Sequence, residues 1–322
     1  MNAVEIKNLR KTFELRIGKG FNRARTEVEA VNDISLQVPG GQSLAFIGPN
    51  GAGKSTTIKI LTGILRPSSG SVEVLGLQPW SQRSKLAREI GVVFGQRSQL
   101  WYHLPPDDTF ELLARVHELE WSEFRKRRDM LVERFKLASF LKTQVRKLSL
   151  GQRMRAEIAA SLLHRPRLVF LDEPTIGLDV VARQELRDLL REWNREEGVT
   201  VFLTSHDAGD VEAVAERVVV VNHGRIVLDD SVGNMRKDYL NSKLLRVVFH
   251  QAPAEKTLPG VKLLSSEHYS RTFEVDTRRI PVSDVITAVL TFAPVADLSI
   301  EDPPLEDVIA HLYAAGPCTA VS

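Results

Sequence analysis

The sequence has little cysteine and no long apolar run. Cys318 is the only cysteine among 322 residues, so no intrachain disulfide can form and a reducing compartment is expected. No stretch of about 18 apolar residues occurs, which argues against a membrane-spanning helix. The first residues, Met1 to Ile6, lack the basic and apolar regions of a signal peptide. We therefore expect a cytoplasmic protein whose membrane role, if it has one, depends on a partner.

The chain also lacks an excess of either charge. It has 43 Lys and Arg residues against 41 Asp and Glu residues, a formal net charge of +2. This balance gives no reason to expect a nucleic-acid partner. The histidines other than His206 show no metal-ligand spacing, and we find no internal repeat or low-complexity tract. With 43% hydrophobic and 26% charged residues, the composition is that of a globular protein with a sizeable core.

The chain does contain a glycine-rich loop of the phosphate-binding type. Gly48, Gly53, Lys54 and Ser55 fit the pattern G-x-x-x-x-G-K-[ST]. An apolar run before the loop predicts a buried strand, and apolar residues at helical spacing after it predict a helix. Glycines let backbone N–H groups turn towards phosphate oxygens, and the helix N-terminus adds the positive end of its dipole. We expect Lys54 to reach the β- and γ-phosphates and the Ser55 hydroxyl to hold Mg²⁺.

A second group of chemically important residues follows a buried strand expected over residues 168–171. Asp172 and Glu173 come directly after this strand. A carboxylate at a strand's carboxyl end, beside the phosphate loop, is placed to hold Mg²⁺, and Asp172 fits that role. Glu173 is then positioned to polarise the attacking water, because the loop supplies charge stabilisation but no base. The alternative is an ordinary acidic pair at a strand end.

Further motifs give the chain a resemblance to the ATPases of ABC transporters. Residues 148–152, Leu-Ser-Leu-Gly-Gln, resemble that family's signature peptide, usually Leu-Ser-Gly-Gly-Gln. Gln96 stands where the family has its Q-loop glutamine, residues 176–179 resemble the D-loop, and His206 resembles the switch histidine. The motifs follow the family's order, and the resemblance covers residues 2 to about 235. Leu150 departs from the usual glycine, while the signature's serine and second glycine remain.

The resemblance implies a role for each motif residue. Glu173 is implied to be the general base, and His206 to contact the γ-phosphate. Ser55 and Gln96 are implied to ligate Mg²⁺, with Asp172 behind them. The implied catalytic residues are Lys54, Gln96, Glu173 and His206, and the implied Mg²⁺ ligands are Ser55, Gln96 and Asp172.

The nucleotide itself is expected to be ATP, held by residues from two chains. Ser149 and Gly151 are implied to touch the γ-phosphate of a nucleotide bound to a second chain. Gly151 begins a helical run, and a helix N-terminus is an anion site. Phe13 is the candidate for stacking on adenine by its position, with Phe21 as the alternative. The expected nucleotide-binding residues are Gly48, Pro49, Asn50, Gly51, Ala52, Gly53, Lys54, Ser55, Thr56, Phe13, Ser149, Gly151, Gln152 and Asp179.

The order of the expected elements predicts an α/β fold with a P-loop NTPase core and an antiparallel β subdomain. Strands that alternate with helices argue for a largely parallel, covered sheet, with antiparallel pieces near both ends of this part of the chain. We expect one ATPase domain over residues 1–235. Its expected strands span residues 4–6, 34–38, 44–47, 72–74, 90–94, 168–171 and 200–203, with a hairpin at 218–228, and the helix after the phosphate loop spans 54–65.

Two further parts of the chain have a different pattern. Strand patterns vanish from about residue 100 to 163, which predicts a helical insertion within the α/β domain. A polar boundary near residues 230–243 precedes a small α+β accessory domain, expected over residues 243–316. Its expected strands span 245–249, 261–264, 272–275 and 295–300, and its expected helices span 281–292 and 305–313.

Two surface features have alternative interpretations. Trp101 and Tyr102 follow the Q-loop segment, which faces the permease in the resembled family. They would suit an interface if exposed, but core packing in the helical insertion is at least as good an explanation. The basic run at residues 125–128 is either a solvated helix face or a docking surface for an acidic partner.

The resulting expectation is the ATP-hydrolysing subunit of an ABC transporter. ATP should clamp two such chains head to tail, most simply as a homodimer, and hydrolysis should release them to drive a separate membrane permease. The protein would then lie at the cytoplasmic face of the membrane through that permease. Residues 297–307 look like the branch that serves drug, lipid and polysaccharide exporters, so export is a hypothesis from resemblance.

Two alternatives remain for the function. A non-transport ABC ATPase is disfavoured because the chain has neither a second cassette nor sustained heptads. An ATP-binding scaffold with little turnover is disfavoured because Lys54, Asp172, Glu173 and His206 are all present.

Overall fold

The chain folds into two compact units. The computed structural model describes residues 2–17, 24–95, 98–239, 242–253, 258–302 and 309. The first unit extends to Asp230, and the second begins at Ser231. Gln96, Phe21 and Cys318 lie outside the described residues, as does the helix expected at 305–313 apart from Ile309.

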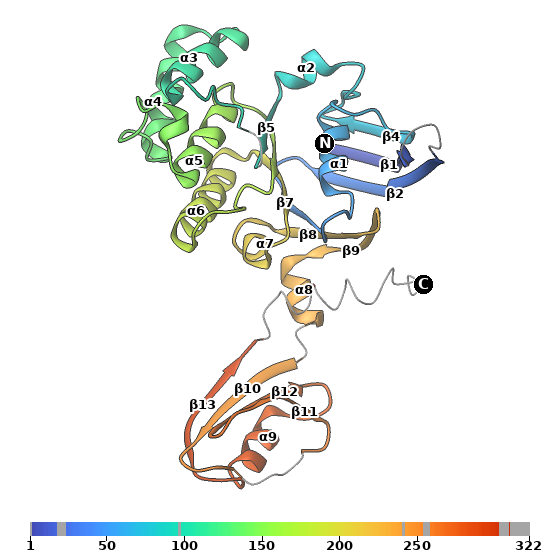
Figure 1. Ribbon diagram of the computed structural model, residues 1–322, viewed down its shortest axis with the longest axis vertical. Helices are drawn as coiled ribbons and strands as arrows, with labels where there is room; N and C mark the ends of the chain where they lie inside the picture. Colours follow the sequence, from blue (N-terminus) through green and yellow to red (C-terminus); the bar gives the residue numbers. More distant parts are fainter. Residues whose placement is uncertain are drawn as a thin grey trace. The chain divides into compact units, whose positions relative to one another are not determined.

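A six-stranded sheet forms the centre of the first unit (Figure 1). Neighbouring strands from β5 to β8 pair in parallel. Strand β9 follows β8 after the two-residue turn His223-Gly224, a connection that only antiparallel neighbours can have. The sheet is therefore mixed, as the sequence predicts. The strand order is β5 (Ile90–Phe94), β6 (Leu168–Asp172), β7 (Thr200–Ser205), β3 (Ser43–Ile47), β8 (Arg217–Asn222) and β9 (Arg225–Ser231).

Alternate residues of the central strands face two different apolar cores. Phe170 of β6 and Phe202 of β7 pack with helix α1 (Lys54–Leu61) and the N-terminal strands. Val169 and Leu171 of β6 pack on the opposite face, against the helices beyond it. Successive strand residues point to opposite faces of a sheet, so both faces of this one are covered. That explains why its strands read as continuous apolar runs rather than as alternating ones.

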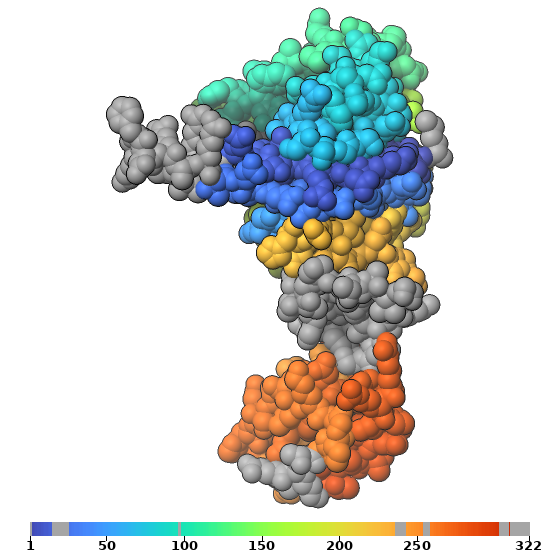
Figure 2. Space-filling model, turned by 90° about the vertical axis from the view of Figure 1, so that its right-hand side faces the viewer, coloured from blue at the N-terminus to red at the C-terminus, as the bar shows by residue number. Residues whose placement is uncertain are grey.

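A separate antiparallel sheet contains the N-terminal strands in the order β2-β1-β4. Strands β1 (Asn2–Ile17) and β2 (Ala24–Pro39) are much longer than expected, while β4 spans Ser69–Val74. Their pairing has several register shifts, and Asn8 and Asp33 take positive φ angles of 49° and 64°. Such bulges break the two-residue alternation on which the sequence prediction relied. Figure 2 shows this sheet's β1 and β2, in blue, across one face of the first unit.

The insertion between β5 and β6 is helical, as expected, and lies beyond the other face of the six-stranded sheet (Figure 1). Helix α6 (Val180–Glu197) packs into the same apolar core as the helices of the insertion. Two short helices, α2 (Arg83–Ala87) and α7 (Ala208–Val214), have no counterpart in the sequence prediction. The insertion consists of α3 (Pro106–Val116), α4 (Trp121–Arg134), the short 3₁₀ turn η1 (Val145–Lys147) and α5 (Leu150–Ser161).

The basic run at residues 125–128 fits neither of its two interpretations as a whole. Arg127 is only 6% exposed and forms a two-pronged ion pair with Glu197, at 2.6 and 2.8 Å. Arg128 pairs with Asp107 at 2.6 Å, whereas Lys126 is exposed. Half of the run therefore binds the helices of the first unit to one another. A charge-only pattern could not predict this, because the acidic partners are distant in sequence.

The second unit contains a four-stranded antiparallel sheet in the order β11-β12-β10-β13. Helix α9 (Val282–Val289) packs on one face, around Phe249, Phe273 and Phe292. Helix α8 (Val232–Tyr239) occupies the segment that was expected to be a polar boundary. No helix in the described parts of either unit is long and apolar enough to span a membrane. The strands are β10 (Ser242–Phe249), β11 (Val261–Ser266), β12 (Ser270–Asp276) and β13 (Val295–Glu301).

Candidate functional site

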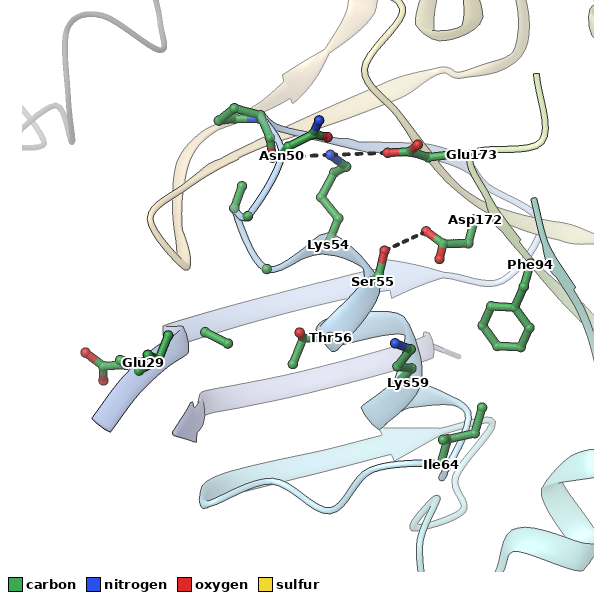
Figure 3. A pocket seen from close by; sticks show the side chains of 16 residues that line it. Glu29, Asn50, Lys54, Ser55, Thr56, Lys59, Ile64, Phe94, Asp172 and Glu173 are labelled. Atoms are coloured by element: carbon green, nitrogen blue, oxygen red, sulfur yellow. Dashed lines mark hydrogen bonds and ion pairs between the residues drawn. The ribbon is translucent and has the colours of Figure 1, made fainter. Parts of the chain in front are cut away.

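A cavity of about 670 Å³ opens at the carboxyl ends of the parallel strands. It lies where β3, β6 and β7 are neighbours, which is where ligands bind in open α/β sheets. The volume suits a nucleotide-sized ligand. Figure 3 shows its wall, with Lys54 directed towards Glu173 and Ser55 towards Asp172. The lining residues are Val28, Glu29, Ala30, Pro49, Asn50, Gly51, Ala52, Gly53, Lys54, Ser55, Thr56, Lys59, Ile64, Phe94, Asp172 and Glu173.

The loop between β3 and α1 needs glycine for two different reasons. A β-carbon on Gly48 would lie 2.3 Å from the Val221 carbonyl oxygen, so the neighbouring strand leaves no room for one. Gly53 has a φ of 104°, which side chains rarely adopt, and its α-carbon faces the Ala30 carbonyl. These restraints hold the loop close to its neighbours, with the backbone N–H groups of the first turn of α1 at the cavity.

Lys54 lies almost completely buried beneath this loop. Its Nζ donates to the carbonyl oxygens of Gly48, at 2.6 Å, and Pro49, at 3.4 Å. The same Nζ lies 3.5 Å from Oε1 of Glu173. The ammonium group therefore joins the phosphate loop to the carboxylate after β6. The Lys54 ammonium group is a buried cation with three donors, and it therefore attracts an anionic ligand to the site.

The Ser55 hydroxyl of α1 and the Asp172 carboxylate of β6 meet at the wall of the cavity. Ser55 Oγ donates to Asp172 Oδ1 at 3.2 Å, and the Thr204 hydroxyl donates to the same oxygen at 2.6 Å. Hydroxyl and carboxylate oxygens are the ligands that Mg²⁺ prefers, so these groups fit that ion. The described residues contain no cluster of three His, Cys, Asp or Glu side chains that could hold a metal.

Glu173 has a backbone conformation that is unusual for its residue type. Its φ is 53°, and its N–H donates to both the carbonyl and the hydroxyl oxygen of Thr204, at 3.1 and 3.2 Å. Gly95 of the neighbouring strand end lies so close that a β-carbon there would be 2.4 Å from the Glu173 carbonyl. His206 Nδ1 lies 3.6 Å from Glu173 Oε2. The sharp turn after β6 thus aims this carboxylate between Lys54 and His206.

A buried acidic residue absent from the sequence prediction supports this turn. Asp210 is 1% exposed and accepts hydrogen bonds from Thr175, Ser205 and Arg187. Thr175 lies two residues after Glu173, and Ser205 directly precedes His206. Asp210 therefore ties both turns to helix α6. Thr204, which holds Asp172 and Glu173, was also missed, because a threonine at a strand end carries no distinctive signal.

The signature peptide lies at the start of α5 and does not line the cavity. The helix begins at Leu150, not after Gly151 as expected, because Ser149 acts as its N-cap. Gln152 N–H donates to Ser149 Oγ at 3.2 Å, and Ser149 N–H donates to Gln152 Oε1 at 3.0 Å. This reciprocal pair is a capping box, which the serine and glutamine at this spacing could have predicted.

The D-loop residues lie beside the signature. Asp179 caps α6, accepting from the Ala182 N–H at 2.8 Å. A β-carbon on Gly151 would lie 3.0 Å from Cβ of Ala182, and one on Gly177 would lie 3.0 Å from Cδ2 of Leu150. Leu150, the departure from the usual signature, thus packs over the D-loop. Two capped helix N-termini stand next to each other outside the cavity.

The aromatic residues expected at ligands or interfaces take different positions. Phe13 lies in β1 with Lys11 Nζ 5.1 Å from its ring centre, and it does not line the cavity. It pairs across the strands with Val28, which does line it. Trp101 and Tyr102 are 46% and 54% exposed, so core packing does not describe them.

Known proteins resemble this chain in sequence. The family described as ABC transporter matches residues 31–176. The chain is 34% identical over 248 residues to the daunorubicin/doxorubicin resistance ATP-binding protein DrrA of Streptomyces peucetius, covering 77% of this chain and 74% of that protein. It is 32% identical to DrrA3 of Streptomyces coeruleorubidus, covering 91% and 94% of the two chains. The lantibiotic transport ATP-binding protein SrtF of Streptococcus pyogenes is 32% identical, with 77% and 96% covered.

Solved structures resemble it in fold. The ATP-binding cassette MJ0796, as a dimer in a post-hydrolysis state with ADP and Pi, superposes with a TM-score of 0.62 at 27% identity, covering 71% of this chain and 98% of that one. Clostridium perfringens cbiO1, part of the ABC transporter complex cbiONQ, has a TM-score of 0.62 at 28% identity, with 74% and 91% covered. The α/β fold with a P-loop NTPase core is thereby confirmed.

Proposed function

This chain belongs to the ABC transporter family as an ATP-binding, ATP-hydrolysing subunit, and we propose that it drives export through a separate membrane permease. The observation that carries the proposal is the junction of Lys54, Glu173 and His206 at the ends of neighbouring strands. Beside a nucleotide-sized cavity, the Glu173 carboxylate lies 3.5 Å from the Lys54 ammonium group and 3.6 Å from the His206 imidazole. Phosphoryl transfer to water uses a cation that stabilises the phosphate charge and a group that positions or deprotonates the attacking water.

The roles follow from what each group can do. Lys54 and the loop N–H groups stabilise the negative charge that develops on the β- and γ-phosphates. Glu173 accepts a proton from the attacking water, since it is the carboxylate aimed into this corner of the cavity. His206, which lies beside Glu173 and is about half exposed, contacts the γ-phosphate. Lys54 exchanges its contact with Glu173 for the phosphates when ATP enters.

Mg²⁺ is the metal that this donor set fits. Ser55 and Asp172 would hold it, together with Gln96, which lies outside the described residues. When bound, the ion supplies charge neutralisation across the β- and γ-phosphates. Thr204 keeps Asp172 oriented for that task through its hydroxyl.

A second copy of the chain completes the site. Ser149, Gly151, Gln152 and Asp179 do not line the cavity of their own chain. The N-terminus of α5 nevertheless offers N–H donors and a positive dipole end to an anion. A related cassette has been observed as a dimer with ADP and Pi. These observations support a head-to-tail homodimer in which α5 of one chain faces the phosphates in the other.

Export is supported by the named relatives. The relatives DrrA and DrrA3 are named for drug resistance and SrtF for lantibiotic transport. The exposed pair Trp101 and Tyr102 suits contact with a permease. The chain would then work at the cytoplasmic face of the membrane.

Replacing Glu173 with glutamine tests the proposal. The Glu173→Gln variant keeps the shape of the side chain but loses the proton acceptor, so ATP turnover should fall at least about 100-fold. ATP binding should persist, and light scattering under saturating Mg-ATP should show a dimer. The matched control is Glu192→Gln, an exposed residue on α6, which should behave as wild type. A strictly monomeric Glu173→Gln protein would refute completion by a second chain, and a wild type with no turnover beside its permease would favour the scaffold.

A further inference from the structure

A buried glutamate in the signature helix is not used by the proposed chemistry. Glu157 lies two turns beyond Ser149 on α5 and is only 5% exposed. Burial raises the pKa of its carboxyl group, and hydrogen bonds from Ser98 and the backbone oppose that rise. A buried carboxylate is costly unless its oxygens are bonded. Its partners therefore indicate why it is there.

The hydrogen-bond partners given for Glu157 all come from the segment that follows Gln96, while Arg153 of α5 adds a favourable charge. The Gln99 N–H donates to both carboxylate oxygens, at 2.9 and 3.2 Å. The Ser98 hydroxyl donates to Oε1, and the Leu100 N–H adds a further hydrogen bond. Leu100 itself is 4% exposed and enters the apolar core. One side chain of α5 thus holds three consecutive residues of a loop.

The same segment is also bonded to the residues just before the signature peptide. The carbonyl oxygen of Tyr102 accepts the Arg146 N–H at 3.0 Å, and that of Leu104 accepts the Val145 N–H at 3.1 Å. We call residues 98–104 the strap. The signature at residues 148–152 lies between two points at which the chain is bonded to the strap. A displacement of the strap must therefore reach the signature from both sides.

The geometry points to Glu157 as a positioning residue for ATP hydrolysis. Its carboxylate fastens the strap to the helix that begins at the signature. The strap starts two residues after Gln96, the expected Mg²⁺ ligand, and α5 starts at Ser149, the expected γ-phosphate contact of the partner chain. Glu157 therefore fixes the position of the strap relative to helix α5. This inference rests on the proposed function, since only a hydrolysing dimer uses the strap and the signature end of α5 at the same time.

An apolar side chain would serve a purely structural role at this position at least as well. Replacing buried charges by well-packed apolar groups is often neutral or stabilising. A leucine could not, however, accept hydrogen bonds from three residues of a loop. The carboxylate is needed for the link between strap and helix, which is a matter of position rather than of core packing.

The test compares Glu157→Ala, Glu157→Gln and Ser98→Ala in the full-length chain. Amide exchange of the 98–104 peptide should accelerate in Glu157→Ala, because the Gln99 N–H loses its acceptor. The kcat for Mg-ATP should fall between about 10- and 100-fold, the scale of misplacement by roughly 1 Å, while the Kd for a fluorescent ATP analogue changes less than about twofold. Glu157→Gln retains one acceptor oxygen and should recover most of the rate. The matched control is Glu133→Ala, an exposed residue on α4.

The outcomes separate the inference from the proposed function. A wild-type chain without turnover would overturn the proposed function itself. A wild-type chain that hydrolyses ATP beside Glu157→Ala and Ser98→Ala variants with unchanged kcat would overturn only the role of Glu157. Should Glu157→Ala not fold, Ser98→Ala removes one bond from the exposed side of the strap and still has to lower kcat, by about two- to fivefold, while leaving the Kd unchanged.

Discussion

Lowering the pH should destabilise the first unit through one pair of stacked histidines. The rings of His117 and His164 lie 4.0 Å apart at an interplanar angle of 9°. His164 Nε2 lies 3.0 Å from the Ile90 carbonyl oxygen, which assigns the proton to that nitrogen. Its Nδ1 is buried without a hydrogen-bond partner among the described residues. Arg88 and Arg127 are the charged groups that act on the pair.

The magnitude follows from the shift of one ionisation. Burial, aided by the charge of His117, lowers the pKa of His164 from 6.5 to about 4. Between these pH values the unfolded chain therefore binds more protons than the folded one. The contribution of His164 to the free energy of unfolding is fully present above pH 6.5 and is lost as the pH falls towards 4. This contribution to the free energy of unfolding is on the order of 3 kcal/mol, of which about 2 kcal/mol is lost by pH 5.

Urea unfolding followed by tryptophan fluorescence measures this loss. All four tryptophans, at positions 80, 101, 121 and 193, lie in the first unit, so the signal reports on that unit. His164→Gln keeps a donor for Ile90 but cannot be protonated. The drop in unfolding free energy from pH 7.5 to 5 should be about 2 kcal/mol smaller in this variant. His103→Gln, at an exposed site, should keep the wild-type pH dependence. Equal pH dependence in His164→Gln and wild type would refute the reasoning.

Two further substitutions test the loop and the helical insertion. Gly48→Ala should weaken binding of a fluorescent ATP analogue at least about tenfold, because the new β-carbon would meet the Val221 carbonyl at 2.3 Å and the loop must move. Gly233→Ala, whose β-carbon has 3.9 Å of space, is the control, and unchanged affinity in Gly48→Ala would contradict the loop geometry. Arg127→Ala should cost about 3 kcal/mol in urea unfolding, because it leaves the Glu197 carboxylate without its cationic partner. A loss below about 1 kcal/mol would assign that ion pair no more than a surface role.

The sequence predicts those features that depend on local patterns. The strand, glycine loop and helix around Lys54 are adjacent in the chain, and apolar periodicity marks both flanks. The buried strand before Asp172 is predicted for the same reason. The motifs shared with the ABC ATPases then identify the fold, because each motif combines particular residue types with a fixed place along the chain.

Features that depend on contacts between distant segments were missed. Arg127 looks like any exposed arginine until Glu197 is brought beside it. Asp210 and Thr204 have no local signature, because their partners come from other strands and helices. The length of β1 was underestimated because bulges at Asn8 and nearby residues disturb the alternation. The link between Glu157 and the strap is of the same kind, because its partners Ser98, Gln99 and Leu100 lie 57 to 59 positions away in the sequence.

The left-handed backbone of Glu173 also bears on what selection must preserve. A residue with a β-carbon loses roughly 1 kcal/mol in this conformation, which glycine adopts freely. Selection for stability alone would thus favour glycine over glutamate at this turn. A lineage that had ceased to hydrolyse ATP would have no reason to keep it. The residue that corresponds to Glu173 is therefore a marker that distinguishes family members that hydrolyse ATP from those that have lost this activity.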